Sequence, residues 1–373
     1  ALVLDERDLL RVALLLIALP VLCALLLGLA RLDLQLSRSV SPAAVTAGSP
    51  AVVTLTLGAG GRLPVAGLLL SDDVPAALGE VPRYAVGTLP RGTTASVHYP
   101  LVPTLRGRHT LGPVQVRLAD PLGLVELVRV LDGTTEVLVR PALVELSGEP
   151  GHLVHSVEIG GTPAGSRGAA QNVPDAMVRP YRHGDDLRSV HWRSTARRDE
   201  LMVRPQEQDR RTGTVVLLDV RAAAHHGAGR HSTFEHAISV AASVAAHLDA
   251  RGRPVQLITS GGVDLGRGEA CLDQLAVLDT VRGASLTGAI GAIGADELIA
   301  VLGSVDAAGA ETLLTATAGN GPARAVVLGA DGAGVAVLRT AGWSVVVARE
   351  RTPTAQVWQQ LCAGTAELAG AGW

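Results

Sequence analysis

The chain has few of the residues that build disulfide frameworks, zinc sites and nucleic-acid surfaces. Its 373 residues include three cysteines, Cys23, Cys271 and Cys362, which lie far apart and form no Cys-x-x-Cys pair. Neither a disulfide framework nor a zinc site follows from them, and a reducing compartment fits best. Lysine is absent, and the 32 basic residues are outnumbered by 35 acidic ones. The formal net charge of −3 argues against a nucleic-acid binder, which needs a basic surface.

Hydrophobic residues are plentiful, and one run of them is long enough to cross a membrane. The mean hydropathy is +0.31, and Val12–Ala30 is an uncharged run bounded by Arg11 and Arg31. Such a helix spans about 30 Å of hydrocarbon at about 1.5 Å per residue. A cleaved signal peptide is the alternative, but this run exceeds a usual signal-peptide core and follows an acidic stretch. We therefore predict a membrane helix, in which Pro20 is tolerated.

The arginines around this run barely decide its orientation. Arg7 and Arg11 precede it, and Arg31 and Arg38 follow it, so the flanking positive charge is nearly balanced. Residues 1–36 are predicted to form the membrane anchor.

Residues 37–146 show short strand-like runs and little helical periodicity. Glycine and proline separate these runs, which is typical of a β-sandwich-like domain. The clearest runs are Ala51–Leu57, Ala95–Val102, Val114–Leu118 and Glu136–Val139. The sequence Asp-Pro-Leu-Gly-Leu at 120–124 predicts a tight turn, in which Gly123 permits a positive φ.

Strands alternate with helices in the last part of the chain. Residues 147–178 are predicted to be a linker, 179–213 a charged motif, and 214–373 an α/β domain. The apolar strands predict a parallel sheet that helices cover on both faces. The predicted strands are Thr214–Asp219, Pro254–Thr259, Ala325–Leu328 and Trp343–Ala348, and the predicted helices are Phe234–Ala250, Glu269–Val281 and Gly334–Thr340. The first helix is expected to start at a capping box formed by Ser232 and Glu235.

The block at 179–207 is the densest polar stretch of the chain and allows three uses. An anion site would draw on Arg179, Arg182, Arg188, Arg193, Arg197 and Arg198. A catalytic site would combine Asp185 or Asp186 with His191, but no Gly-x-Ser-x-Gly elbow accompanies them. A structural or docking element would use Tyr181 and Trp192 as anchors and arginine–aspartate pairs to fix geometry. We favour this third use, in which the element either braces the domains of the chain or docks a partner.

The same block resembles the domain-of-unknown-function 58 family. The family pattern is Arg-x-Tyr-x-x-Gly-Asp-x-x-Arg-x-Ile-x-Trp. The chain matches it at Arg179, Tyr181, Gly184, Asp185, Arg188 and Trp192, with Val190 in place of Ile. The turn at 120–124 matches the family's Asp-Pro-Phe-Gly-Leu, with Leu for Phe. The resemblance implies a bacterial membrane-anchored protein whose α/β domain is von Willebrand factor A-like, of Rossmann type.

Asp219 is the position at which that family resemblance predicts a metal ligand. Ligands of parallel α/β sheets bind beyond the carboxyl ends of strands, and Asp219 ends the first predicted strand. A von Willebrand A-type site begins Asp-x-Ser-x-Ser, because a hard divalent ion needs hydroxyl and carboxylate oxygens. Arg221 and Ala223 replace both serines here. We therefore predict a degenerate site without a metal, in which Asp219 pairs with arginine or backbone N–H groups.

Four histidines follow this position, at His225, His226, His231 and His236. Imidazoles bind zinc, but this spacing fits no standard pattern. We interpret these histidines as structural.

The combined prediction is a non-enzymatic scaffold or co-chaperone of the bacterial inner membrane, with its soluble domains in the cytoplasm and no cofactor. The family resemblance implies a MoxR-type AAA+ ATPase as partner, since such genes are commonly neighbours. Other membrane or envelope proteins are further expected partners, and nucleic acid is not. Two alternatives stay open: a hydrolase or envelope-processing enzyme that uses Asp185 and His191, and a metal-dependent adhesion module.

Overall fold

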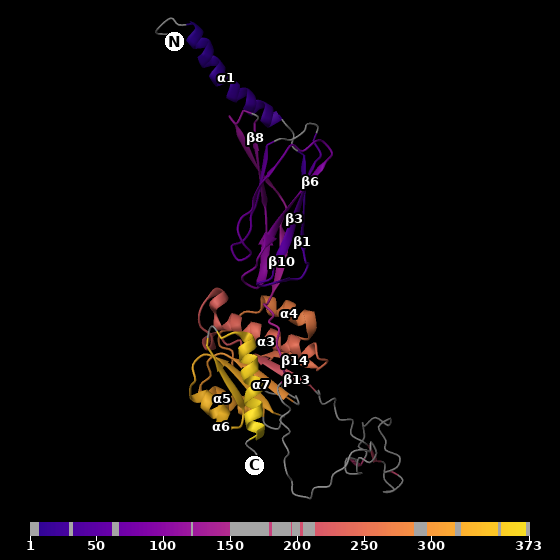
Figure 1. The fold of residues 1–373 in the computed structure, drawn as a ribbon, viewed down its shortest axis with the longest axis vertical. Coiled ribbons are helices and arrows are strands. Elements are labelled where there is room, and N and C mark those ends of the chain that lie inside the picture. The colour runs from indigo at the N-terminus through magenta and orange to yellow at the C-terminus, as the bar shows by residue number, and fades with distance from the viewer. Residues whose placement is uncertain are drawn as a thin grey trace.

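The computed structural model describes an apolar helix, a β domain and an α/β domain (Figure 1). The residues that it describes are 7–29, 33–61, 67–120, 122–149, 179–180, 195, 202–203, 213–286, 297–317, 322–349 and 352–370.

Helix α1 (Arg7–Leu29) contains residues 12–29 of the predicted apolar run and begins five positions before Val12; Ala30 lies outside the described residues. Its stretch Arg7–Leu25 is long and apolar enough to cross a membrane, by length and composition. Leucines and isoleucine point outward all round this helix, which is the surface expected of a helix surrounded by hydrocarbon rather than by water. Pro20 lies inside the helix, as predicted.

The β domain consists of three small sheets around one core. The first has the order β1 (Leu34–Ser41), β3 (Ala51–Ala59), β6 (Thr94–Leu101), and the second β5 (Arg83–Val86), β4 (Leu68–Asp72), β8 (Val114–Ala119), β9 (Glu126–Leu131). The third has the order β2 (Val45–Thr46), β10 (Thr135–Arg140), β7 (Gly107–Leu111). All pairs are antiparallel except β2 with β10.

Alternation of apolar and polar residues places one face of each strand in this core. In β3, Val53, Leu55 and Leu57 are buried and their neighbours point outward. The predicted runs at 51–57, 114–118 and 136–139 lie in β3, β8 and β10, and the run at 95–102 lies in β6 up to Leu101, so these strand predictions are confirmed. Strand β1 already begins at Leu34, inside the range predicted for the anchor.

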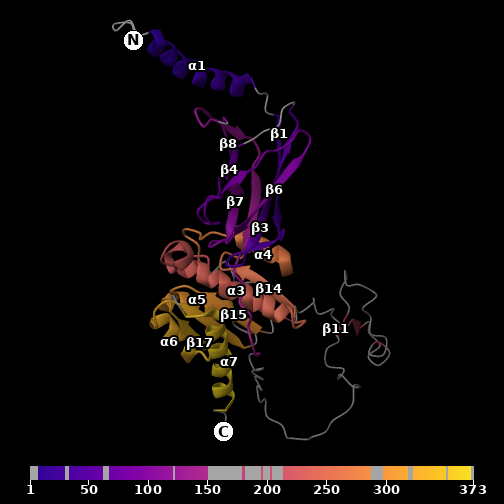
Figure 2. The ribbon, with the colours of Figure 1, turned by 45° about the horizontal axis from the view of Figure 1, so that its top comes forward.

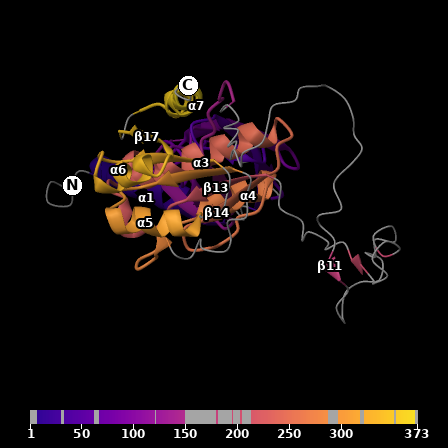
Figure 3. The ribbon, with the colours of Figure 1, turned by 90° about the horizontal axis from the view of Figure 1, so that it is seen from below.

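The α/β domain contains a parallel sheet, as predicted. Its strand order is β14 (Val255–Thr259), β13 (Thr214–Leu218), β15 (Glu297–Leu302), β16 (Ala323–Leu328), β17 (Ser344–Ala348). The helices are α3 (Thr233–Asp249), α4 (Gly268–Val277), α5 (Ala307–Ala316), α6 (Ala333–Thr340) and α7 (Thr354–Gly370), with short turns of 3₁₀ helix at Ala222–Ala224 and Gly229–His231. Figure 3 views this domain from the end opposite α1.

Both faces of this sheet are buried, so its strands read as continuous apolar runs. Val216 and Leu218 of β13 pack in a core with α3, α4 and α7, whereas Val215 and Leu217 pack in a second core with α5 and α6. Ser232 caps α3, and its hydroxyl oxygen accepts a hydrogen bond from the Phe234 N–H. The sequence patterns did not indicate β15, α5 or α7.

Helix α4 ends at Val277, earlier than the predicted end at Val281. The backbone turns extended at Leu278, and the carbonyls of Leu275 and Leu278 accept hydrogen bonds from Arg106 of the β domain. These contacts satisfy carbonyl groups that the end of a helix leaves free.

The two domains lie end to end, with α1 at the far end of the β domain (Figures 1 and 2). Arg140, at the end of β10, pairs through Nε with Asp273 of α4 at 2.6 Å. The chain then follows α3, where the Ser239 hydroxyl donates to the Ala142 carbonyl and the Val144 N–H donates to the Ser243 hydroxyl. Leu146 completes the α/β core. This segment therefore fastens one domain to the other.

Candidate functional site

Strand order places a candidate site beside Asp219. Strand β13 lies between β14 and β15, so the chain leaves β13 toward one side and later returns on the other. In parallel sheets such a switch opens a crevice beyond the carboxyl ends of the strands, where ligands bind. Asp219 follows β13, Ser260 follows β14, and Gly303 and Ser304 follow β15. These four residues therefore lie together at the edge of the sheet formed by the carboxyl ends of the strands.

The Asp219 carboxylate is fully buried and receives four hydrogen bonds. Arg221 supplies three of them: Nε to Oδ1 at 2.9 Å, Nη2 to Oδ2 at 2.8 Å, and its backbone N–H to Oδ1 at 3.0 Å. The Gly303 N–H donates to Oδ2 at 3.2 Å. The predicted pairing of Asp219 with arginine and backbone N–H groups is confirmed. A carboxylate held this way needs no further cation to offset its burial.

Arg221 connects the end of β13 with the end of β15. Besides its bidentate pair with Asp219, its Nη2 donates to the Ser304 carbonyl at 3.1 Å. The side chain of Arg221 is 17% exposed, whereas that of Asp219 is not exposed at all. The guanidinium therefore lies between the carboxylate and solvent, where an ion approaching Asp219 would have to bind.

The nearby hydroxyls are also occupied. The Ser260 oxygen accepts a hydrogen bond from the Val220 N–H at 3.1 Å, and the Ser304 hydroxyl lies 3.2 Å from the Ala224 carbonyl, to which it donates. A hard cation needs about six oxygen ligands, and a positive charge beside Asp219 repels it. The residues present therefore do not fit a divalent metal ion.

His225 connects this edge with α3. Its Nε2–H donates to the Asp219 carbonyl at 2.9 Å, which leaves Nδ1 facing the Thr233 hydroxyl at 3.3 Å. The ring packs edge-on against Phe234 at 5.2 Å. Burial lowers the pKa of His225 below its ordinary value. The imidazole is thus held neutral beside the ion pair.

His226 is near enough to help lower the pKa of His225, whereas His231 and His236 have other surroundings. Arg230 donates to the His231 ring, and burial lowers the pKa of His236. Across the described residues, no group of three or more histidine, cysteine, aspartate or glutamate side chains could hold a metal ion.

Phe234 links the Asp219 edge to the β domain through Arg106. The Arg106 guanidinium lies over the Phe234 ring, 5.3 Å from its centroid, and forms an ion pair with Glu235. It also donates to the Leu275 carbonyl at 2.8 Å. Sequence reasoning missed Arg106, because an arginine in a loop between two strands carries no signal of its partner. The packed series Asp219, His225, Phe234 and Arg106 joins the carboxyl-end edge of the sheet to the domain interface.

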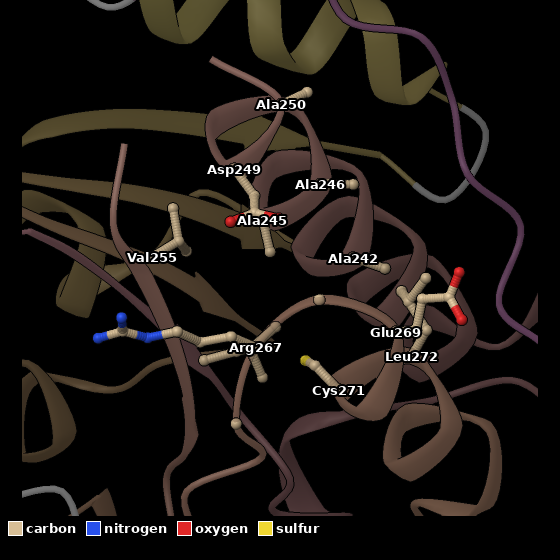
Figure 4. Close-up of a pocket in the computed structure, with 13 residues that line it drawn as sticks. Ala242, Ala245, Ala246, Asp249, Ala250, Val255, Arg267, Glu269, Cys271 and Leu272 are labelled. Carbon is tan, nitrogen blue, oxygen red and sulfur yellow. The ribbon is translucent and has the colours of Figure 1, made fainter. Parts of the chain in front are cut away.

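A separate cavity of about 230 Å³ lies between α3, β14 and α4 (Figure 4). Alanines of α3, together with Val255 and Leu272, make it largely apolar, and the Cys271 thiol faces it. Burial raises the pKa of Cys271 to about 11, so the thiol stays protonated at neutral pH and is a poor nucleophile. We assign no chemistry to this cavity.

Most of the predicted motif lies outside the described residues. Tyr181, Gly184, Asp185, Arg188, His191 and Trp192 are among these, as are Asp186 and the arginines at 182, 193, 197 and 198. Arg179 belongs to a short strand, β11 (Arg179–Pro180), that pairs antiparallel with β12 (Met202–Val203). The structure thus pairs the start of the motif with residues 202 and 203 near the end of the polar block.

Comparison with known proteins addresses the same region. Residues 177–267 match the family described as "Protein of unknown function DUF58". This match covers the charged motif and Asp219. The chain is also 26% identical over 219 residues to the uncharacterized protein YeaD of Bacillus subtilis (strain 168), over 56% of this chain and 52% of YeaD. The chain therefore spans about half the length of that curated relative. Both findings support the DUF58 family.

Solved structures show weaker likeness. The CARDB domain of the PF1109 protein from Pyrococcus furiosus is 18% identical, with a TM-score of 0.22, over 29% of this chain and 88% of that one. The alkylpurine DNA glycosylase AlkC of Pseudomonas fluorescens is 18% identical, with a TM-score of 0.20, over 29% of this chain and 31% of that one. Likeness at this level carries no argument about function.

Proposed function

We propose that this DUF58-like chain is a membrane-anchored, non-enzymatic scaffold or co-chaperone that binds protein partners. The observation that carries the proposal is the saturated Asp219 carboxylate, which lies at the ligand-binding edge of the sheet and is paired within the chain. An edge closed by an internal ion pair suits a domain that presents a surface better than one that binds metal or performs catalysis.

Three finer statements belong to the same proposal. The α/β domain is von Willebrand A-like, which the parallel sheet and an aspartate directly after its first strand support. Helix α1 anchors the chain in the bacterial inner membrane, with the domains in the cytoplasm, which its apolar length supports. The partner class is a MoxR-type AAA+ ATPase, on the family resemblance of Arg179, Tyr181, Gly184, Asp185, Arg188 and Trp192.

Capture of that ATPase tests the scaffold role. The full chain, solubilised from membranes, serves as bait for a purified MoxR-type ATPase from the same genome. We expect Trp192→Ala to abolish capture if the motif docks the partner, or to lower stability by about 3–5 kcal/mol if the motif braces the domains. His191→Ala, the matched control in the same motif, should retain capture. Loss of function with His191→Ala at unchanged stability would instead support the hydrolase alternative.

Titration of Mg²⁺ and Mn²⁺ into the full chain tests the closed edge. We expect no saturable heat, because the Arg221 guanidinium and backbone N–H groups already satisfy Asp219. Micromolar binding that Asp219→Ala abolishes would overturn the proposal and make a metal-dependent adhesion module the leading function.

A further inference from the structure

The turn between β8 and β9 presents apolar side chains to its surroundings. Leu122 is 59% exposed and Leu124 is 47% exposed, and Val128 and Val130 of β9 also point outward. The two leucines of the turn form the apolar patch, whereas Val128 and Val130 share their face of the hairpin with Glu126 and Arg117.

Asp120 fixes the turn in this conformation. Its carboxylate accepts the Leu122 N–H at 2.9 Å and the Val125 N–H at 2.6 Å, and its carbonyl accepts the Gly123 N–H at 2.9 Å. Gly123 has a φ of 68°, which a glycine adopts readily. Because Asp120 is satisfied by the turn itself, the turn holds its leucines outward without presenting an unpaired charge.

This turn lies at the end of the β domain where α1 is attached (Figures 1 and 2). Cys23 of α1 is near enough to Asp120 to help lower the pKa of that carboxyl, and Leu27 packs against the β core. On the exposed face of the hairpin next to the turn, Arg117 and Glu126 lie 3.8 Å apart and offset each other's charge. The exposed leucines are therefore next to the apolar helix, in a locally neutral region.

We propose that Leu122 and Leu124 insert into the boundary between lipid headgroups and acyl chains and give the β domain a second contact with the membrane. The proposal rests on the anchoring of α1 in the membrane. Lipid is the occupant because the patch is continuous with the end of the apolar helix, which places it at the depth of the bilayer surface. One contact by a helix leaves a domain free to tilt, whereas a second contact beside it restricts that motion.

Spin labelling of the full chain in liposomes tests this contact. Labels are placed by Leu122→Cys, by Leu16→Cys in α1, and by Val52→Cys in β3, an exposed valine of the same domain. Cys23→Ser and Cys362→Ala remove competing thiols, with a hydroxyl donor kept near Asp120, and Cys271 stays because it is buried with a pKa of about 11. We expect labels at 122 and 16 to collide several-fold more with oxygen than with a water-soluble nickel complex, and the label at 52 to show the reverse.

Three other outcomes would overturn the proposal in distinguishable ways. If the label at 122 is as accessible to nickel as that at 52, while the label at 16 reports lipid, the turn is in water and only α1 is anchored. If the label at 16 also reports water, anchoring itself fails. If the label at 122 is shielded from both oxygen and nickel, protein covers the turn in place of lipid.

Discussion

Two buried aspartate–arginine pairs, one in each domain, differ in how they are assembled. In the β domain, Arg38 Nη2 lies 2.7 Å from Asp72 Oδ1, and both side chains are almost fully enclosed. In the α/β domain, Arg221 pairs with Asp219 at the same kind of distance but keeps its guanidinium partly in solvent. The first pair joins residues 34 positions apart, and the second joins residues two positions apart.

The surroundings of Asp72 explain the difference. Its carboxylate also accepts the Tyr99 hydroxyl at 2.5 Å, and Arg38 donates further to the Leu111 carbonyl and the Thr135 hydroxyl. These residues come from β1, β4, β6, β7 and β10, so the pair ties the three sheets together. The Asp219 pair instead closes an edge. We therefore call the Asp72 pair a brace, because it holds the three sheets together, and the Asp219 pair a plug, because it fills the edge of the sheet where a ligand would bind.

Asp72→Ala is expected to have the largest effect. It leaves the Arg38 cation and the Tyr99 hydroxyl buried without their partner, which costs about 3–5 kcal/mol in the free energy of unfolding. Urea unfolding followed by circular dichroism measures this loss. Asp73→Ala, at the exposed neighbouring position, is the matched control and should change little. A loss below about 1 kcal/mol for Asp72→Ala would contradict the role as a brace.

Asp219→Ala is expected to cost less, about 1–3 kcal/mol, because Arg221 can turn toward water when its partner is removed. Trp343 and Trp358 are buried in the α/β domain, so tryptophan fluorescence follows its unfolding. If the loss equals that of Asp72→Ala, the distinction between brace and plug does not hold.

Replacement of Arg221 sharpens the comparison further. Arg221→Ser combined with Ala223→Ser restores both hydroxyl positions and removes the repelling cation, so Mg²⁺ should bind with a dissociation constant on the order of 1 mM. Arg221→Lys keeps a positive charge and is the control that should not bind. Isothermal titration decides between them. A folded double variant without binding would show that more than Arg221 and Ala223 separates this edge from a metal site.

The smallest expected effect is on the pH dependence of folding stability. Burial lowers the pKa of His225, which lies beside the Asp219 pair, so the folded state favours the neutral ring. The unfolded state then binds more protons than the folded state, and stability falls as pH drops below the ordinary histidine value of 6.5 toward the folded-state value. His225→Gln should flatten this slope in thermal melts between about pH 7 and pH 5. An unchanged slope in that variant would assign the pH dependence to other groups, His236 among them.

Much of the fold could be predicted because it depends on local periodicity. The apolar run at 12–30 predicted α1, alternation predicted β3, β6, β8 and β10, and apolar strands between helices predicted the parallel sheet. Ser232 predicted the start of α3, since a cap acts within one turn. Strand β15 escaped prediction, although every one of its residues is buried, because a short apolar run does not distinguish a strand from a helix.

In the candidate site too, the sequence predicted the local contacts but not the contacts between distant segments. Asp219 and its pairing with Arg221 followed from the sequence by itself, because a strand end and a residue two positions later are near in any fold. Arg38, which the sequence presented as a charge flanking the membrane run, is instead enclosed with Asp72, and Arg106 reaches across to Phe234. Only the tertiary structure decided these partners. Polar side chains on distant strands carry no periodic signal, and their pairing is set by which strands the sheets bring together.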